Sequence, residues 1–410
     1  PAPAMPGIRI SGRVRAGQHV RRRGEDLRVG DAALPAGRRL MPADIGVAAS
    51  LGLAAAHAGA QSSVSISGTV DVSVRQVRNQ GLGTVTSQAS GANSTSKLVL
   101  RGQEDLGDGL SAGFYLDGSL LADTGAMGAS GPFWDRRSTV SLASRQWGEL
   151  RLGRDWVPTH LVWSGFDPFA TLGIGSANGF RSFTASRALG QAFGTAPESQ
   201  AANPTLRVSN AVEYFLPAGL GGLQGVSGSL IATLGEKGAT AAGQTRGNGF
   251  RLGWAGAGWN VAGAQFTTRN TLSGIHFKDQ SYGVSYDFGW LKASLAQRRW
   301  VHGVDRTVNT LVGMSVPVGS GVVKLSYVKA DQTGATAAQS ASDADLWALG
   351  YVHSLSRRTA LYAHAARMSN RNGAAFAIAG GVAVSGNPAA ANYFGGRAST
   401  AFELGIRHDF

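Results

Sequence analysis

The side chains of this chain that could carry chemistry are charged rather than nucleophilic. The sequence contains no Cys, which excludes thiolate nucleophiles and thiolate metal sites. The H-E-x-x-H zinc motif is absent, and "WSGFD" and "SISGT" are not nucleophile elbows. Beyond residue 60 the histidines fall in turns, long connectors and separate strands: His160, His276, His302, His353, His364 and His408. No nucleophile, base and orienting group come together in this pattern, so we do not expect an enzyme.

Basic residues, by contrast, recur on one face of alternating segments. In 96–105, Leu98 and Leu100 share one face, so Lys97 and Arg101 share the other. Rings of basic side chains in a narrow passage select anions, and rings of acidic ones select cations. These segments therefore indicate a polar surface that could sort ions by charge.

Two further segments carry the same pattern. In 206–216 the outward set is Val208, Val212 and Tyr214, which places Arg207, Ser209 and Glu213 on the polar face. In 136–144, Val140 and Leu142 place Arg137 on the polar face. The strand barely begins there, so both Arg136 and Arg137 remain candidates.

The stretch "VSISGTVDVSVR", residues 64–75, shows the element that would position such residues. Val64, Ile66 and Val70 share one parity, whereas Ser65 and Asp71 share the other. This alternation predicts a strand with one apolar and one polar face, as in a soluble sandwich or in a membrane barrel with a wet lumen.

The whole chain beyond residue 60 repeats this two-residue period. We predict sixteen strands: 63–75, 96–105, 110–122, 136–144, 148–155, 206–216, 223–235, 247–256, 259–269, 280–287, 290–300, 308–317, 321–330, 344–353, 358–369 and 400–410. The connectors alternate between short Gly-rich turns such as 106–109 and long polar segments such as 156–205. Sorting of short and long connectors to opposite rims is typical of outer-membrane barrels, so we predict an all-β, sixteen-stranded antiparallel transmembrane β-barrel. The modest apolar fraction suits a barrel without a large dry core.

The first 60 residues differ from the remainder. They contain Arg21–Arg23 and no strand pattern, and then run from Arg38 and Arg39 through an apolar stretch to Ala58 and Ala60. This order predicts an upstream extension plus signal peptide, 1–60, cleaved after Ala60 to leave a barrel of 61–410. A basic arm is the alternative. The formal net charge of +13 also fits an anionic membrane surface, anionic solutes or nucleic acid, but no nucleic-acid motif accompanies it.

The last segment, "STAFELGIRHDF", alternates to its final residue, Phe410. With "SKLVLRGQEDLGDGL", "RRSTVSLASRQWGELRLGRD" and "LGYVHSLSRRTALYAH", it resembles the general porins of Gram-negative bacteria, and most of all the anion-selective porins of beta-proteobacteria. The resemblance covers nearly all of 61–410. It implies a homotrimer in outer-membrane lipid, short periplasmic turns, long extracellular loops and a third loop, here 156–205, folded into the pore. Phe410 would be the assembly signal.

The resemblance also implies a pore constriction. Its basic residues would be Lys97, Arg136 or Arg137, and Arg207, opposed by the acidic residues Asp117 on the wall and Asp167 in the inner loop. Lys97 departs from the family, which usually has Arg at that position. Other basic residues are interpreted as wall charges or loop fasteners: Arg151, Arg154, Arg181 and Arg187. Three tryptophans are interpreted as interface girdle or loop packing: Trp156, Trp163 and Trp290.

These features predict a porin for passive diffusion of small hydrophilic solutes and ions, with moderate anion preference, no cofactor, no metal and no nucleic-acid partner. A substrate-specific channel of the same barrel class is the alternative, because the inner loop sets the pore shape. A barrel-embedded enzyme and a soluble β-rich binding protein are less favoured.

Overall fold

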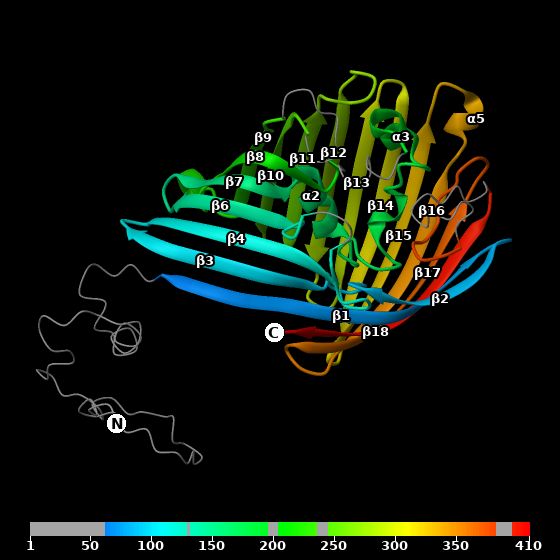
Figure 1. Ribbon diagram of the computed structural model, residues 1–410, viewed down its shortest axis with the longest axis horizontal. Coiled ribbons are helices and arrows are strands. Elements are labelled where there is room, and N and C mark those ends of the chain that lie inside the picture. Colours follow the sequence, from blue (N-terminus) through cyan, green and yellow to red (C-terminus); the bar gives the residue numbers. More distant parts are fainter. Residues whose placement is uncertain (1–61, 129–131, 196–203, 236–244, 383–395) are drawn as a thin grey trace, which may run out of the picture. The chain divides into compact units, whose positions relative to one another are not determined.

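The computed structural model describes residues 62–128, 132–195, 204–235, 245–382 and 396–410. The predicted cleavage site after Ala60, and the whole of 1–60, lie outside these residues. Each of the sixteen predicted strands is present, and together they form one antiparallel ring (Figure 1). The ring consists of β1 (Ser63–Asn79), β3 (Lys97–Gly107), β4 (Leu110–Leu121), β6 (Arg137–Ser144), β7 (Gly148–Trp156), β8 (Arg207–Phe215), β9 (Val226–Thr233), β10 (Gly247–Gly256), β11 (Trp259–Thr268), β12 (Phe277–Asp287), β13 (Lys292–His302), β14 (Asp305–Val318), β15 (Gly321–Thr333), β16 (Ala344–Ser354), β17 (Thr359–Asn370) and β18 (Ala398–Asp409).

The ring closes through β1, which pairs with β3 over Ser63–Thr69 and with β18 over Thr69–Asn79. Closure leaves no unpaired strand edge in the ring. Two strands outside the ring were not predicted. β2 (Gly83–Ser90) forms a hairpin with the second half of β1, and β5 (Ala126–Met127) pairs with the end of β4. β2 reads "GTVTSQAS", whose weak alternation gives little signal for a strand.

The two faces of β1 confirm the predicted alternation. Val64 and Ile66 are 73% and 68% exposed, whereas Asp71 is fully buried on the opposite face. The outer surface therefore carries the apolar residues, and the inner surface carries the polar ones.

One predicted face is wrong. Val208 was placed outward, but it is buried and packs with Val157 and Phe266 inside the ring. The pairing of β7 with β8 shifts between Gly153 and Asp155, and Asn210 adopts a left-handed φ of 55° there. Such a bulge inserts one residue into a strand and turns Val208 to the inner side, while Arg207, the first residue of the strand, also lines the interior.

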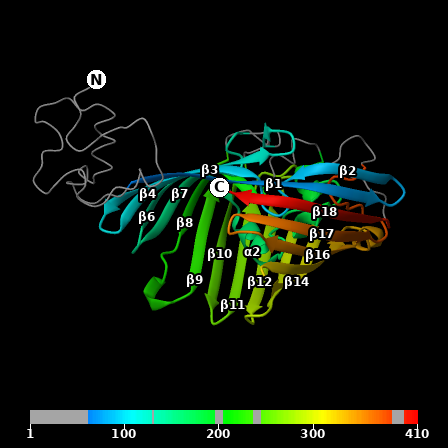
Figure 2. The same ribbon diagram turned by 90° about the horizontal axis from the view of Figure 1, so that it is seen from below.

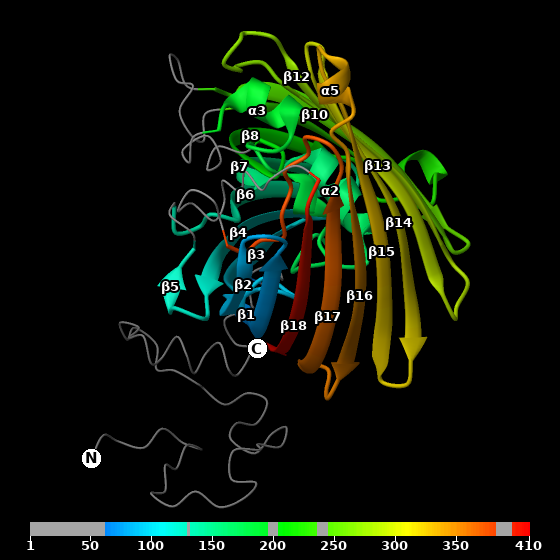
Figure 3. The same cartoon turned by 90° about the vertical axis from the view of Figure 1, so that its right-hand side faces the viewer.

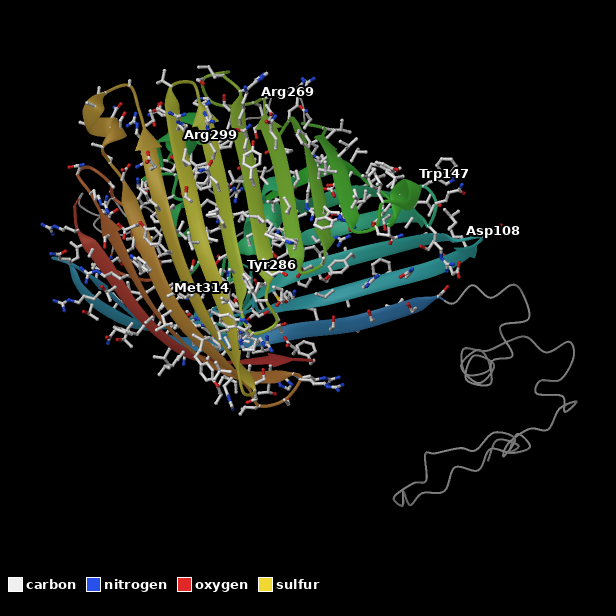
Figure 4. The ribbon with its side chains drawn as sticks, turned by 180° about the vertical axis from the view of Figure 1, so that it is seen from behind. Asp108, Trp147, Arg269, Tyr286, Arg299 and Met314 are labelled. Atoms are coloured by element: carbon white, nitrogen blue, oxygen red, sulfur yellow. The ribbon has the colours of Figure 1, made fainter. Side chains whose placement is uncertain are left out.

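Aromatic side chains mark the outer surface near the short turns. Trp259, Tyr286 and Phe288 form a chain of ring contacts 4.6–4.7 Å between centroids, and Trp290 extends it. Figure 4 shows Tyr286 toward the short-turn rim and Arg269 toward the long-loop rim of the outer wall. This distribution matches the aromatic girdle of a membrane barrel, so the interpretation of Trp290 as a girdle residue is supported.

The long connector 157–206 is more structured than the sequence suggests. It contains α2 (Pro158–Phe166), the 3₁₀ helix η2 (Ala177–Phe180) and α3 (Arg187–Phe193). Pro158 lies in the first turn of α2, where a missing backbone N–H costs nothing. Three short helices of nine residues or fewer leave too few turns for a visible helical period. Two short helical segments lie in other connectors: η3 (Leu220–Gly222) and α5 (Ala337–Ser340).

This connector folds inward, and we refer to it as the inner loop. α2 contacts β10–β13, α3 contacts β13 and β14, and η2 contacts β15 (Figure 2). Apolar loop residues such as Trp163, Phe169 and Phe180 are almost fully buried against the inner wall. A dry core therefore does exist inside the ring, contrary to the expectation from composition. It lies on the β11–β17 side, whose strands stand side by side in Figure 3.

None of the helices in the described ranges is long and apolar enough to cross a membrane.

Candidate pore constriction

A cavity of about 900 Å³ lies between the inner loop and residues at the ends of β1, β2, β4, β7, β8 and β17 and in the connectors beside them. The loop contributes the segments around Leu161–Gly165 and Ala170–Ser182, and the wall contributes Asp135, Arg136 and Arg207. This arrangement brings together the part of the lumen that the loop narrows and two of the predicted basic residues.

Arg207 lies at the start of β8, and its guanidinium carbon is 3.5 Å from the ring centre of Trp156. The ring of His160 also stacks on Trp156, with the two centroids 4.6 Å apart. Arg207 forms no ion pair with any described residue, and its Nε has no hydrogen-bond partner among them. The flat tryptophan ring thus holds the guanidinium in place without a direct ion pair to a described carboxylate.

Arg136 lies 5.5 Å above the same tryptophan ring but is compensated. Its Nε is 3.2 Å from both carboxylate oxygens of Asp117, and its backbone N–H donates to the carbonyl of Asp117. Asp117 is only 5% exposed. The predicted basic and acidic candidates at these two positions therefore meet as an ion pair at the cavity edge.

Arg137 also lies on the lumen side, which answers the choice that the sequence left open. It is paired in register with Asp117, and its Nε is 3.3 Å from Asp155. Arg136 precedes the strand and escapes strict alternation, so both arginines face inward. Arg137 belongs to a wall network of Arg151, Glu149, Asp155 and Glu213 and lies 4.3 Å over the ring of Tyr115.

Lys97 begins β3 and lies opposite Thr69, which is buried on the inner face. Its neighbours Thr95 and Ser96 line the cavity. The structure therefore places Lys97 on the lumen side, at the rim of the candidate constriction and apart from the tryptophan stack.

Asp167 has a different environment from the one that its sequence position suggests. Its carboxylate accepts the backbone N–H groups of Phe169, Thr171 and Ala177 at 2.9–3.0 Å. Burial raises the pKa of the carboxyl group, while these three N–H donors and the charge of Lys324 act in the opposite direction. Ala170 and Thr171 adopt left-handed φ values of 50° and 61°, which cost free energy in residues with a Cβ. Asp167 thus ties together a strained turn.

Arg181 is a cavity residue that the sequence reasoning assigned to loop fastening. It lines the cavity from the loop side, and no described residue forms a hydrogen bond with its Nε or an ion pair with its side chain. Burial lowers the pKa of its guanidinium to about 10, so it remains charged at neutral pH. Arg187, six residues further, does fasten the loop through a 2.9 Å ion pair with Asp305. The different environments of these two arginines arise only in the folded loop.

His160 completes the cavity on the loop side. Burial and the surrounding charges of Arg298, Arg207, Arg181 and Arg136 hold its pKa well below the ordinary value of 6.5. Its Nδ1 has no hydrogen-bond partner among the described residues. His160 is therefore neutral at neutral pH and adds no charge to the arginines.

The remaining chemistry in the lumen shows no metal or catalytic arrangement. In the part of the chain that the structure describes, no group of three His, Asp or Glu side chains could hold a metal ion. "GLSAG", residues 109–113, has the spacing of a nucleophile elbow, which the sequence reasoning overlooked. The structure places it in the β3–β4 turn and the start of β4, whereas such elbows connect a strand to a helix.

Comparison with known proteins gives a consistent result over most of the chain. The family model described as Gram-negative porin matches residues 47–373. Outer membrane porin protein 32 of Delftia acidovorans is 37% identical over 375 residues, covering 86% of this chain and 95% of the relative. An outer membrane porin protein of Bordetella pertussis is 28% identical over 325 residues, covering 68% of this chain and 78% of the relative. A second family model, for the MoeA N-terminal region, matches only residues 4–52, outside the described residues.

Solved structures share the architecture. The anion-selective porin from Comamonas acidovorans superimposes with a TM-score of 0.70 at 32% identity, covering 85% of this chain and all of the other. OmpT of Vibrio cholerae superimposes with a TM-score of 0.56 at 11% identity, over 85% of this chain and 98% of the other, which indicates a common fold alone.

Proposed function

The chain belongs to the Gram-negative porin family, and from this membership we propose that its barrel forms a water-filled outer-membrane channel with moderate preference for anions. The observation that carries the anion preference is the pair Arg207 and Arg181. Both line the same cavity, from opposite sides, and neither forms an ion pair with a described residue. The printed description of the Comamonas protein as anion-selective supports the proposal.

The charge balance of the cavity supports a moderate rather than an exclusive preference. Three arginines line it, Arg136, Arg181 and Arg207, against the carboxylates of Asp117 and Asp135. Unit charges about 4 Å apart interact by about 4 kcal/mol at an effective dielectric of 20, so Asp117 cancels most of the field of Arg136. About one positive charge remains in excess, and ions that pass within the Debye length of about 8 Å at physiological salt are only partly screened from it.

We assign the predicted residues different roles in this proposal. Arg207 supplies the main attraction for anions, and Lys97 adds to it at the rim. Arg136 is moderated by Asp117, while Arg137 belongs to the neutralised wall network. Asp167 holds the turn of the inner loop rather than facing permeating ions.

The zero-current potential across a salt gradient tests the anion preference. Arg207→Ala should lower the anion-to-cation permeability ratio about two-fold, because it removes a cavity-lining charge that forms no ion pair with a described residue. Arg269→Ala is the matched control, since it removes the same charge from the outer wall (Figure 4). Cation preference in the unmodified protein, or equal effects of the two substitutions, would contradict the assignment.

We further propose that residues 1–60 are removed on export, that the barrel assembles as a homotrimer, and that Phe410 directs this assembly. The backbones of Phe410 and Gly68 exchange two hydrogen bonds of 3.0–3.1 Å, and a Cβ on Gly68 would lie 2.4 Å from the ring. Gly68 thus leaves room for the terminal ring.

Folded trimer isolated from outer membranes should begin at Gln61, and deletion of Phe410 should reduce its yield several-fold. Unchanged yield would count against the assembly role.

A further inference from the structure

The turn of the inner loop lies directly on glycines of the barrel wall. Gly283 is on β12 and Gly313 is on β14. A Cβ atom built on Gly283 would lie 2.1 Å from Cδ2 of the Phe166 ring, and one on Gly313 would lie 2.6 Å from Cδ of Pro168. Both distances are below the 3.0 Å that real Cβ atoms essentially never show. No residue with a side chain fits at either position while the loop stays where it is.

A third glycine continues the line on the next alternate strand. Gly350 lies on β16, and a Cβ there would lie 2.9 Å from the ring of Phe169 and 2.8 Å from that of His364. Between these strands the loop rests on another small residue, Ser294 of β13, whose hydroxyl donates to the carbonyl of Phe166 at 2.8 Å. The wall under this turn therefore contains several small residues in register with it, while Lys324 of β15, paired with Gly350, lies 5.7 Å over the ring of Phe169.

The backbone does not explain these glycines. None of the three has a φ in the left-handed region, so their strand conformation is open to any residue. Glycine inside a strand weakens the strand, and it is usual where another backbone or a ligand approaches closely. Here the approaching group is the inner loop, and the missing side chain of each glycine leaves the space that the loop occupies.

We call the contact of the inner-loop turn with these three glycines the seat of the loop. The seat affects the cavity because the turn that joins them is rigid. Phe166, Pro168 and Phe169 face the wall, whereas Ala170–Gly173, on the other side of the turn, line the cavity. Asp167 fastens the two sides together through its three backbone hydrogen bonds. A displacement at the wall therefore moves the cavity-lining side by a similar amount.

We propose that Gly283, Gly313 and Gly350 set how closely the inner loop lies against the wall and thereby the width of the passage between the loop and the two wall arginines Arg136 and Arg207. They act as positioning residues that touch no permeating solute. The inference rests on the proposed function only in that the loop is taken to bound the conducting path.

Gly313→Ala tests the seat. The added Cβ needs about 1 Å more room than the loop leaves, because interiors are close-packed. The loop should move toward Arg207, and single-channel conductance should fall by about a third. Gly263→Ala is the matched control, since it adds the same methyl group to a glycine of β11 where the Cβ would meet the exposed side chain of Tyr282, at 3.3 Å, and no atom of the inner loop. Its conductance should stay within about a tenth of the unmodified value.

A double-mutant cycle separates loop displacement from general damage. The Cδ and Cγ atoms of Pro168 lie 2.6 and 2.7 Å from the added Cβ, so Pro168→Ala should restore conductance when combined with Gly313→Ala. If Gly313→Ala alone fails to assemble, recovery of the folded barrel in the double variant supports the seat. Failure of both variants, unchanged conductance in Gly313→Ala, or a double variant no better than the single one would overturn it.

Failure of the proposed function has a different signature. Cation preference in the unmodified protein would contradict the anion channel but leave the conductance difference between Gly313→Ala and Gly263→Ala intact. Unchanged conductance in Gly313→Ala, with anion preference retained, would contradict the seat alone.

Discussion

The two sides of the lumen wall differ in what they present to the interior. The strands β3–β8 carry Arg137, Arg151, Asp155 and Glu213 on their inner face, arranged in ion pairs. On the inner face of β11–β17, small residues such as Ala296 and Ala348 lie among larger apolar ones such as Leu311, and the inner loop covers them. One side is built to remain in contact with water, and the other is built to be covered.

This difference follows from the size of the ring. Sixteen strands enclose more space than their own side chains can fill. The chain fills part of that space with its own inner loop, whose aromatic residues need an apolar wall of small residues to pack against. A charge on that side loses contact with water and needs a partner there, whereas the cavity on the opposite side is open.

Arg298 is a fully buried charge on the β11–β17 side and has such a partner. It is fully buried on β13 and forms a 2.6 Å ion pair with Asp279. Asp279 also accepts the hydroxyl of Thr159 at the start of the loop, and Arg298 donates to the carbonyl of Thr205 at its end. This pair therefore joins both ends of the inner loop to the wall.

Substitution of Arg298 should have the largest effect, because it removes the attachment of the inner loop to the covered side of the wall. Arg298→Met leaves Asp279 as an uncompensated buried charge, which costs about 3–5 kcal/mol. We expect a lower midpoint of heat-induced unfolding in detergent and strongly increased channel noise, because both loop ends lose their anchor. Arg187→Met removes a partly exposed pair with Asp305 and should cost about 0–1 kcal/mol. Similar behaviour of the two variants would show that the wall does not hold the loop through Arg298.

Two neighbouring arginines on the charged side test whether a cavity-lining charge affects selectivity more than a charge paired within the wall. Arg136 lines the cavity, whereas Arg137 is enclosed in the wall network with Asp155. Arg136→Ala should lower the anion-to-cation permeability ratio by about a third, and Arg137→Ala should change it by less than about a tenth. Asp117→Asn should raise the ratio, because it releases Arg136 from its partner. The zero-current potential measures all three, and a larger effect of Arg137 would overturn the division between cavity and network.

The smallest expected effect concerns pH and the stability of the loop. The pKa of His160 is held well below 6.5 by burial and by the surrounding arginines. Below pH 6.5 the unfolded chain therefore binds more protons at this site than the folded one, so folded stability decreases as the pH falls. The loss is at most about 1.4 kcal/mol per pH unit. Urea unfolding between pH 7 and 5 should show this slope in the unmodified protein and not in His160→Gln. An equal slope in both would place the titration elsewhere.

Much of the architecture could be predicted from the sequence alone. The two-residue period placed all sixteen ring strands within a few residues of their observed ends, because one face must be apolar and the other polar along the full length of a barrel strand. The same alternation placed Lys97 and Arg137 on the lumen side. The alternation did not reveal β2, which is polar on both faces. It also placed Val208 on the wrong face, because a bulge lies beside that residue.

The tertiary structure alone decided how the charges are paired and which of them remain free. Arg181 and Arg187 are both arginines of the inner loop, yet one lines the cavity and the other pairs with Asp305. Asp117 and Asp167 are both aspartates near the pore, yet one meets Arg136 and the other ties backbone N–H groups. Alternation along a strand is local and is therefore written in the sequence, whereas the partner of a charge depends on contacts between segments more than a hundred residues apart, such as Arg187 and Asp305.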